Sequence, residues 1–172
     1  MRFAAPVVRR AVPADFAEVA RLTVEAYHAD GQLEEDHGYG VLLADVATRA
    51  EHSEILVAQD VSGETLLGAV AFVLPGTRYA ELSEPGEAEF RMLAVDPAAQ
   101  RRGVARALVR ACVERASVLG CASLVIGTRD RNTAAFALYE HFGFVREPAL
   151  DWTPAPGVNL LGLRLKLPAA IL

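Results

Sequence analysis

Apolar residues recur at helical spacing in four parts of the chain. These parts run from Pro13 to about Tyr27, from about Val41 to Glu51, from Arg101 to Leu119 and from Arg131 to Phe142. Proline and an acid open the first, and glycine ends the last two, as is usual at helix termini. Each is therefore predicted to be a helix with one buried stripe. In the first helix the stripe is expected to consist of Phe16, Val19, Ala20, Thr23, Val24 and Tyr27.

Shorter apolar and β-branched runs predict strands between the helices. They are Val7 to Ala11, Glu54 to Asp60, Thr65 to Leu74, Ala88 to Val95, Cys121 to Gly127, Phe144 to Arg146 and Leu160 to Leu167. The second and third are separated by only four residues, which predicts an antiparallel hairpin. The polar segments 29–39 and 75–86 predict loops.

The order of these elements predicts a single domain over residues 1–172 of the α/β class, in the sense of an α+β mixed sheet. A strand, a long helix and a buried strand follow one another from Ala88 to Gly127, which predicts a parallel βαβ unit. The chain shows no internal repeat or linker that would divide it.

Composition limits the possible binding partners more than it limits the possible folds. Lys and Arg number 17 against 22 for Asp and Glu, so a net charge of -5 favours neither nucleic acid nor an anionic membrane as a partner. No apolar run approaches the roughly 20 residues of a membrane span. Pro6, Arg9 and Arg10 interrupt any secretory signal, so we expect a cytoplasmic location. The two cysteines lack the paired spacing of a zinc site, and no metal is expected.

The segment from Asp96 to Ala105 lies where a predicted strand ends and a long helix begins. Unpaired backbone N–H groups and the positive end of the helix dipole make such a terminus an anion site. Gly103 and Ala105 leave the backbone accessible to a diphosphate, and Arg101, Arg102 and Arg106 add positive charge. The alternative is that Gly103 only eases helix entry and that the arginines form a solvated face. Neither common nucleotide-binding motif, GxGxxG nor GxxxxGK[ST], occurs in the chain.

Two motifs in this region resemble those of the GNAT superfamily of coenzyme A-dependent N-acetyltransferases. Gln100-Arg101-Arg102-Gly103-Val104-Ala105 resembles the family's pyrophosphate loop, with alanine in place of its second glycine. Asn132-x-x-Ala135-x-x-Leu138-Tyr139, followed by Gly143-Phe144, is similar to the second motif. The resemblance implies a mostly antiparallel sheet with one parallel βαβ unit and helices on both faces.

The resemblance also implies how acetyl-CoA, the expected cosubstrate, would be held. Backbone groups of Gln100, Arg101, Arg102, Gly103, Val104 and Ala105 would bind the pyrophosphate, with Arg106 as a side-chain neighbour. Backbone groups of Leu93, Ala94 and Val95 would contact the pantetheine arm, and so would the second-motif residues Asn132, Ala135 and Tyr139.

Two residues are candidates for catalysis on the same grounds. Glu89 matches a glutamate that serves some family members as general base, directly or through water. Its alternative is an exposed strand carboxylate or a partner for Arg91. Tyr139 matches a tyrosine beside the thioester sulfur; its alternative is a core tyrosine. An unperturbed phenol has a pKa of about 10 and a thiol about 8.5, so full proton transfer would be uphill by roughly 2 kcal/mol. Hydrogen-bond stabilisation of the leaving thiolate is therefore the expected role.

The acceptor is expected to be a primary amine of a small molecule. Tyr27, Asp30 and Tyr39 correspond to the acceptor wall of similar proteins, as does the acidic loop from Glu81 to Glu87. The alternatives are a protein N-terminus or lysine as the acceptor, or a module that binds coenzyme A without turnover. Other candidate bases, none of them in a motif, are His28, His37, His52 and His141. Association into a homodimer is compatible with all of these.

Overall fold

The computed structural model describes residues 2–34 and 38–169, and these form two compact units. One unit comprises Met1–Phe72 and Met92–Cys112, and the other comprises Val73–Arg91 and Val113–Leu172. Strand β4 (Glu87–Val95) and helix α4 (Val104–Val118) run from one unit into the other. The expectation of one domain stays a prediction.

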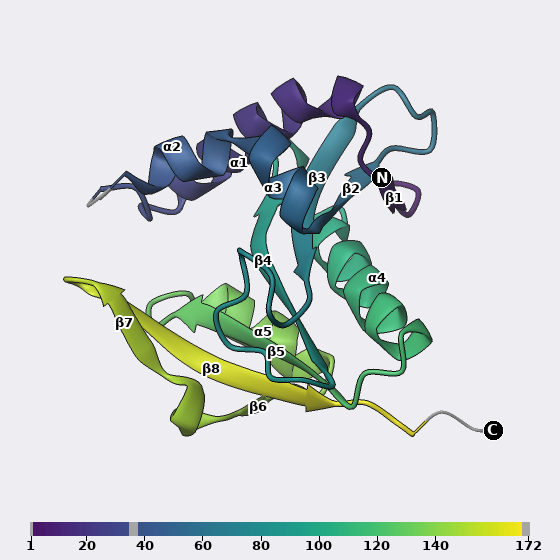
Figure 1. The fold of residues 1–172 in the computed structure, drawn as a ribbon. Coiled ribbons are helices and arrows are strands. Elements are labelled where there is room, and N and C mark those ends of the chain that lie inside the picture. The colour runs from purple at the N-terminus through teal and green to yellow at the C-terminus, as the bar shows by residue number, and fades with distance from the viewer. Residues whose placement is uncertain (1, 35–37, 170–172) are drawn as a thin grey trace. The chain divides into compact units, whose positions relative to one another are not determined.

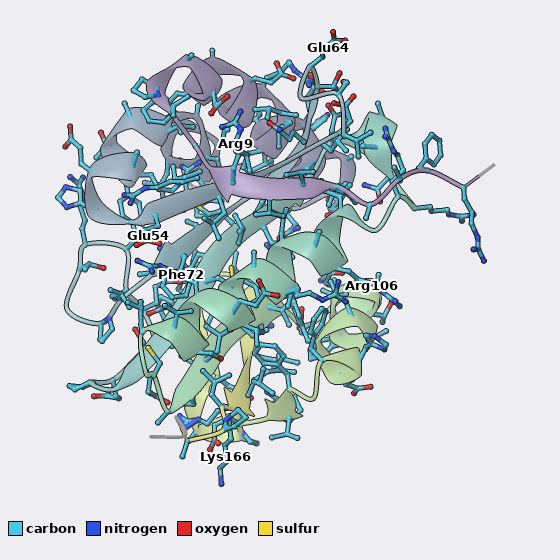
Figure 2. All side chains as sticks on the ribbon, turned by 90° about the vertical axis from the view of Figure 1, so that its right-hand side faces the viewer. Arg9, Glu54, Glu64, Phe72, Arg106 and Lys166 are labelled. Atoms are coloured by element: carbon cyan, nitrogen blue, oxygen red, sulfur yellow. The ribbon has the colours of Figure 1, made fainter. Side chains whose placement is uncertain are left out.

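The first unit contains three strands and three helices ahead of its share of β4 and α4 (Figure 1). The strands are β1 (Val7–Arg10), β2 (Glu54–Gln59) and β3 (Leu66–Val73), and the helices are α1 (Phe16–Ala29), α2 (Tyr39–Ala44) and α3 (Val46–His52). The strands β1, β2 and β3 pair antiparallel, which confirms the predicted hairpin. Figure 2 labels Glu54 and Phe72, which face each other at one end of that hairpin.

The sheet of this unit is covered by helices on both faces. Helices α1 and α3 pack on one face through a core of Val19, Leu22, Ala26, Val46, Ile55, Val57, Ala69 and Ala94. The buried stripe of α1 therefore contains Leu22 and Ala26, which the predicted stripe lacked. On the other face Gly68 lies under α4, because a Cβ added to it would approach Val104 Cγ1 to 2.7 Å. The side-chain alternation of β3 explains why Gly68 and Ala69 face different helices.

The second unit is built on β5 (Ser123–Arg129) and β8 (Val158–Lys166), which pair antiparallel. Strands β6 (Val145–Arg146) and β7 (Trp152–Ala155) also pair antiparallel with β8, and α5 (Thr133–His141) completes the unit. Strand β4 pairs with β5 in parallel. The strand order β1-β2-β3-β4-β5-β8-β6 confirms the predicted mixed, mostly antiparallel sheet with one parallel βαβ unit.

Three elements differ from the sequence prediction, each for a local reason. The predicted helix over 41–51 is two helices, because Asp45 leaves helical geometry and its carboxylate caps Thr48 N at 3.2 Å. Helix α4 begins at Val104 rather than Arg101. Strand β7 was not predicted; it contains Pro154, which a strand paired along one edge tolerates. Within the described residues no helix is long and apolar enough to cross a membrane.

The β6–β8 edge is held by a bidentate ion pair that should make stability depend on pH. Arg146 donates to both carboxylate oxygens of Asp151 at 2.8 Å, and Gly162 N donates at 2.7 Å. These hydrogen bonds lower the pKa of Asp151 to about 2. A folded-state pKa below the unfolded value contributes stability above pH of about 4, and this contribution disappears as the pH falls towards 2.

Asp151→Asn is therefore expected to lower the free energy of unfolding by about 1 kcal/mol at pH 7, because the pair is about one-third exposed and screened by water. Denaturant titrations of both proteins at several pH values measure the difference. This difference in the free energy of unfolding should become smaller below a pH of about 4. Glu114→Gln, on the exposed side of α4, serves as a neutral control. A difference that is equal at pH 7 and at pH 2.5 would contradict the assignment.

Candidate active site

The turn between β4 and α4 is rigidly attached at its start. Asp96 N donates to Leu67 O of β3 at 2.8 Å, and the Asp96 carboxylate accepts from Ala98 N at 2.9 Å. Arg101 and Gly103 then adopt positive φ angles of 63° and 76°. A left-handed residue cannot continue a right-handed helix, which is why α4 starts three residues later than predicted.

The backbone amides at the start of α4 can receive an anion. Ala107 N donates to Gly103 O at 3.1 Å as the first bond of the helical pattern, so the amides before it have no carbonyl four residues earlier in the helix. A Cβ added to Gly103 would meet no heavy atom within 4 Å. The turn therefore offers donors, the positive helix end and open space.

Three arginines surround these amides. Arg101 and Arg106 are exposed, and Figure 2 labels Arg106 on the first turn of α4. The Arg102 guanidinium lies 4.3 Å from the centre of the Phe3 ring, a cation–π contact. Its Nε is buried and has no hydrogen-bond partner among residues 2–34 and 38–169. A buried donor without a partner is costly, so an anion placed here would relieve it. The residues present thus fit a diphosphate.

An ion pair fixes the base of this turn to α1. Arg21 donates to Asp96 Oδ2 at 2.6 Å, and it also pairs with Glu25 at 2.7 Å and with Glu18. Partial burial alone would raise the pKa of Asp96. The Ala98 N–H bond and the Arg21 contact outweigh it, so the pKa of Asp96 is lowered. Asp96 therefore stays ionised near neutral pH, and the turn keeps its cap.

The backbone N–H and C=O groups of Leu93 and Val95 point away from β3. Amides alternate between the two edges of a strand, and Asp96 N is directed at Leu67 of β3. The backbone N–H group of Ala94 therefore points to the same side as that of Asp96, whereas the N–H groups of Leu93 and Val95 point to the opposite side. Their backbone groups are therefore placed on the edge where the predicted pantetheine contacts would form; those contacts stay a prediction.

The parallel pairing of β4 with β5 is short. It covers Glu87–Glu89 against Ser123–Val125 and ends there, although β4 continues to Val95. Met92, beyond the end of the pairing, has φ of 56°, which is unusual for a residue with a side chain. Such backbone irregularity in a strand is common beside active sites. The sequence gives no signal for the positive φ of Met92.

Glu89 lies fully inside the second unit. It is 1 % exposed, so the alternative of an exposed strand carboxylate is wrong. Its Oε1 accepts from the amides of Glu81 at 3.0 Å, Leu82 at 3.2 Å and Ser83 at 3.0 Å, and from Ser83 Oγ at 2.7 Å. The Arg91 side chain pairs with Glu81 at 2.8 Å. The predicted role of Glu89 as base remains a prediction.

Tyr139 packs in an aromatic cluster on the opposite side of β4. Its ring centre lies 5.9 Å from that of Phe90 and 5.8 Å from that of Phe144, and the residue is 6 % exposed. Because successive side chains alternate along a strand, Phe90 and Glu89 face opposite sides. The structure therefore brings both catalytic candidates to one short stretch of β4 without direct contact between them.

Asn132 begins the helix that carries Tyr139. Its Oδ1 accepts from Ala135 N at 3.1 Å, so it is the N-cap of α5. The amide nitrogen of the same side chain is a donor that this cap does not use. Asn132 can therefore cap the helix and still donate to a ligand, and its contact to pantetheine stays a prediction.

Comparison with known proteins identifies the fold that this geometry belongs to. Residues 16–144 match the model of the Acetyltransferase (GNAT) family, which covers most of the chain and both motifs. The chain belongs to this family. The match confirms the resemblance found in the sequence, and the family is one of acetyltransferases.

Three relatives show how far the similarity extends. The ribosomal protein bS18-alanine N-acetyltransferase of Escherichia coli is 43% identical over 58 residues, which are 34% of this chain and 39% of that protein. A histone acetyltransferase and related acetyltransferase from Corynebacterium glutamicum superposes with a TM-score of 0.72 at 25% identity over 98% of both chains. A Bacillus subtilis acetyltransferase in complex with CoA superposes with a TM-score of 0.64 at 20% identity, over 94% of this chain and 99% of its own. The chain thus spans about two fifths of the curated relative it matches.

The acceptor-side role of Tyr27 and Tyr39 stays a prediction. The rings of Tyr27 and Tyr39 lie 5.8 Å apart and join α1 to α2. Residues 35–37 of the adjoining loop, including the candidate base His37, lie outside the described residues. Among the residues that are described, no group of three or more His, Cys, Asp or Glu side chains is arranged to hold a metal ion.

Proposed function

We propose that this chain transfers an acetyl group from acetyl-CoA to a primary amine of a small molecule by direct attack of the amine on the thioester. The observation that carries the proposal is the turn 100–106, with its left-handed Gly103, its free helix end and its arginines. Acetyl-CoA would supply the acetyl group in activated form. Its use is supported by the family match and by a similar fold that binds CoA.

The binding residues in this proposal are those of the two motifs. Backbone amides of Gln100 to Ala105 hold the diphosphate, and Arg106 stands beside it. Backbone groups of 93–95 and the Asn132 amide orient the pantetheine arm, with Ala135 leaving room on α5.

The chemistry divides between the two sides of β4. Tyr139 donates a hydrogen bond to the sulfur as negative charge develops on it. On the other side, Glu89 supports the proton transfer from the amine. Because its Oε1 already accepts four hydrogen bonds and the residue is 1 % exposed, it would act through a water or a neighbouring group.

A second candidate keeps the reaction and changes the acceptor to a protein N-terminus or a lysine. The 58-residue similarity to an N-acetyltransferase that acts on an alanine of a ribosomal protein favours it. A module that binds coenzyme A without turnover is the third candidate.

The cytoplasmic location and the homodimer remain predictions.

A matched acceptor panel tests the proposal. The pure protein is incubated with acetyl-CoA and either small primary amines or peptides with free alanine N-termini or lysines. Free thiol and acetylated product are then measured together. We expect kcat/KM above about 10⁴ M⁻¹s⁻¹ for at least one small amine and a much lower value for peptides. Preference for a peptide would establish the second candidate. Tight CoA binding without any product would establish the third.

A further inference from the structure

The Glu89 carboxylate serves as an anchor for the loop that precedes β4. Its Oε1 accepts hydrogen bonds from three successive backbone amides, those of Glu81, Leu82 and Ser83, and from the Ser83 hydroxyl. Its Oε2 accepts from Leu82 N at 3.4 Å. A buried carboxylate whose Oε1 is fully engaged in this way orders a loop, but it is poorly placed to meet an amine that arrives from solvent.

Glu81 is the acid that this anchor places beside the strand. Its carboxylate pairs with Arg91 Nε at 2.8 Å, and its side chain is 23 % exposed. Arg91 in turn donates to Tyr79 O at 3.0 Å, which ties the other end of the loop to β4. The Glu81 side chain is therefore held in one position and is still accessible to a solute.

The surroundings of Glu81 favour its protonated form more than water does. The charged groups that act on it are Arg91 and Glu89, both on β4. Burial raises the pKa of Glu81, the Arg91 guanidinium opposes this, and the Glu89 carboxylate reinforces it, so the pKa lies above the ordinary value. A general base works best when its pKa approaches the working pH.

We propose that Glu81 is the catalytic base that takes the proton from the acceptor ammonium, and that Glu89 is a positioning residue that orders its loop. The proposal rests on the acetyl transfer proposed above. One ammonium proton moves to the Glu81 carboxylate, and the freed nitrogen lone pair forms the bond to the acetyl carbon as the C–S bond breaks. The sulfur keeps the C–S electron pair and takes the second proton released from nitrogen, so thiol and amide result. Glu81 returns its proton to solvent.

The pH dependence of kcat/KM between about pH 5 and 8 separates the roles of the residues. The wild-type protein should lose activity as the pH falls through the Glu81 titration. Glu81→Gln should lower kcat roughly 100-fold and abolish that acid limb, while Glu81→Asp should restore part of the rate. Glu89→Gln should keep the limb but move it to lower pH, because it removes the negative charge that disfavours ionisation of Glu81.

Controls keep this test independent of folding and of the proposed function. Glu64→Gln, an exposed acid on the β2–β3 turn labelled in Figure 2, should behave as wild type. Calorimetry should show unchanged CoA affinity for Glu81→Gln, which excludes misfolding. Absence of product from the wild-type protein with every acceptor overturns the acetyl transfer itself. Wild-type turnover together with an unchanged kcat and acid limb in Glu81→Gln overturns only the assignment of Glu81.

Discussion

Replacing Tyr139 with phenylalanine should lower kcat by roughly 100-fold and change the Kd for CoA by no more than about twofold. The ring would remain packed between Phe90 and Phe144, whose centres lie 5.9 and 5.8 Å away, so the fold should not change. The variant would lose only the hydroxyl that donates to the sulfur in the transition state. Steady-state kinetics with acetyl-CoA and calorimetry with CoA measure the two quantities.

A loss confined to kcat would show that the hydroxyl acts in the transition state rather than in binding. An unfolding midpoint close to the wild-type value serves as the check on packing. An unchanged kcat would remove Tyr139 from the reaction and leave it as a core residue of the aromatic cluster.

Gly103→Glu should weaken CoA binding by at least roughly 100-fold, because it places a carboxylate where the diphosphate would lie. The side chain has space, since a Cβ at this position meets no heavy atom within 4 Å. The φ of 76° adds a strain of about 1 kcal/mol, which lowers stability without preventing folding. Calorimetric titration with CoA gives the affinity.

Gly120 offers a matched control at the other end of α4. It has a φ of 75°, and a Cβ added to it likewise meets no heavy atom within 4 Å. Gly120→Glu should therefore cost similar stability and leave the Kd for CoA unchanged. Equal losses of affinity in both variants would mean that strain, and not the position of the charge, is responsible. Normal affinity in Gly103→Glu would refute the diphosphate site.

The turn proposed to bind the diphosphate is the part of the candidate site that follows most directly from the sequence. The residue types from Gln100 to Ala105 can be seen directly in the sequence, as can their position after a strand and before an amphipathic helix. The proposed binding depends on the backbone amides and on the charge of these residues. The error concerns the helix boundary. A positive φ at Arg101 leaves no trace in the sequence, because arginine rarely adopts it, and the prediction therefore extended the helix over the turn.

The acceptor side could not be predicted to the same depth. Whether Glu89 faces solvent or a loop depends on tertiary contacts of segment 79–83, which has no periodic pattern. The ion pair of Glu81 with Arg91 likewise depends on how that loop folds back onto β4. The break at Asp45 is similar, because an aspartate in a helical pattern can equally be a surface residue or a cap.

The most direct test of the account is a crystal structure of the protein grown with CoA. The two phosphates should lie within hydrogen-bond distance of the backbone amides from Gln100 to Ala105. A structure with CoA bound elsewhere, or with these amides bonded to the protein's own oxygen atoms, would contradict it.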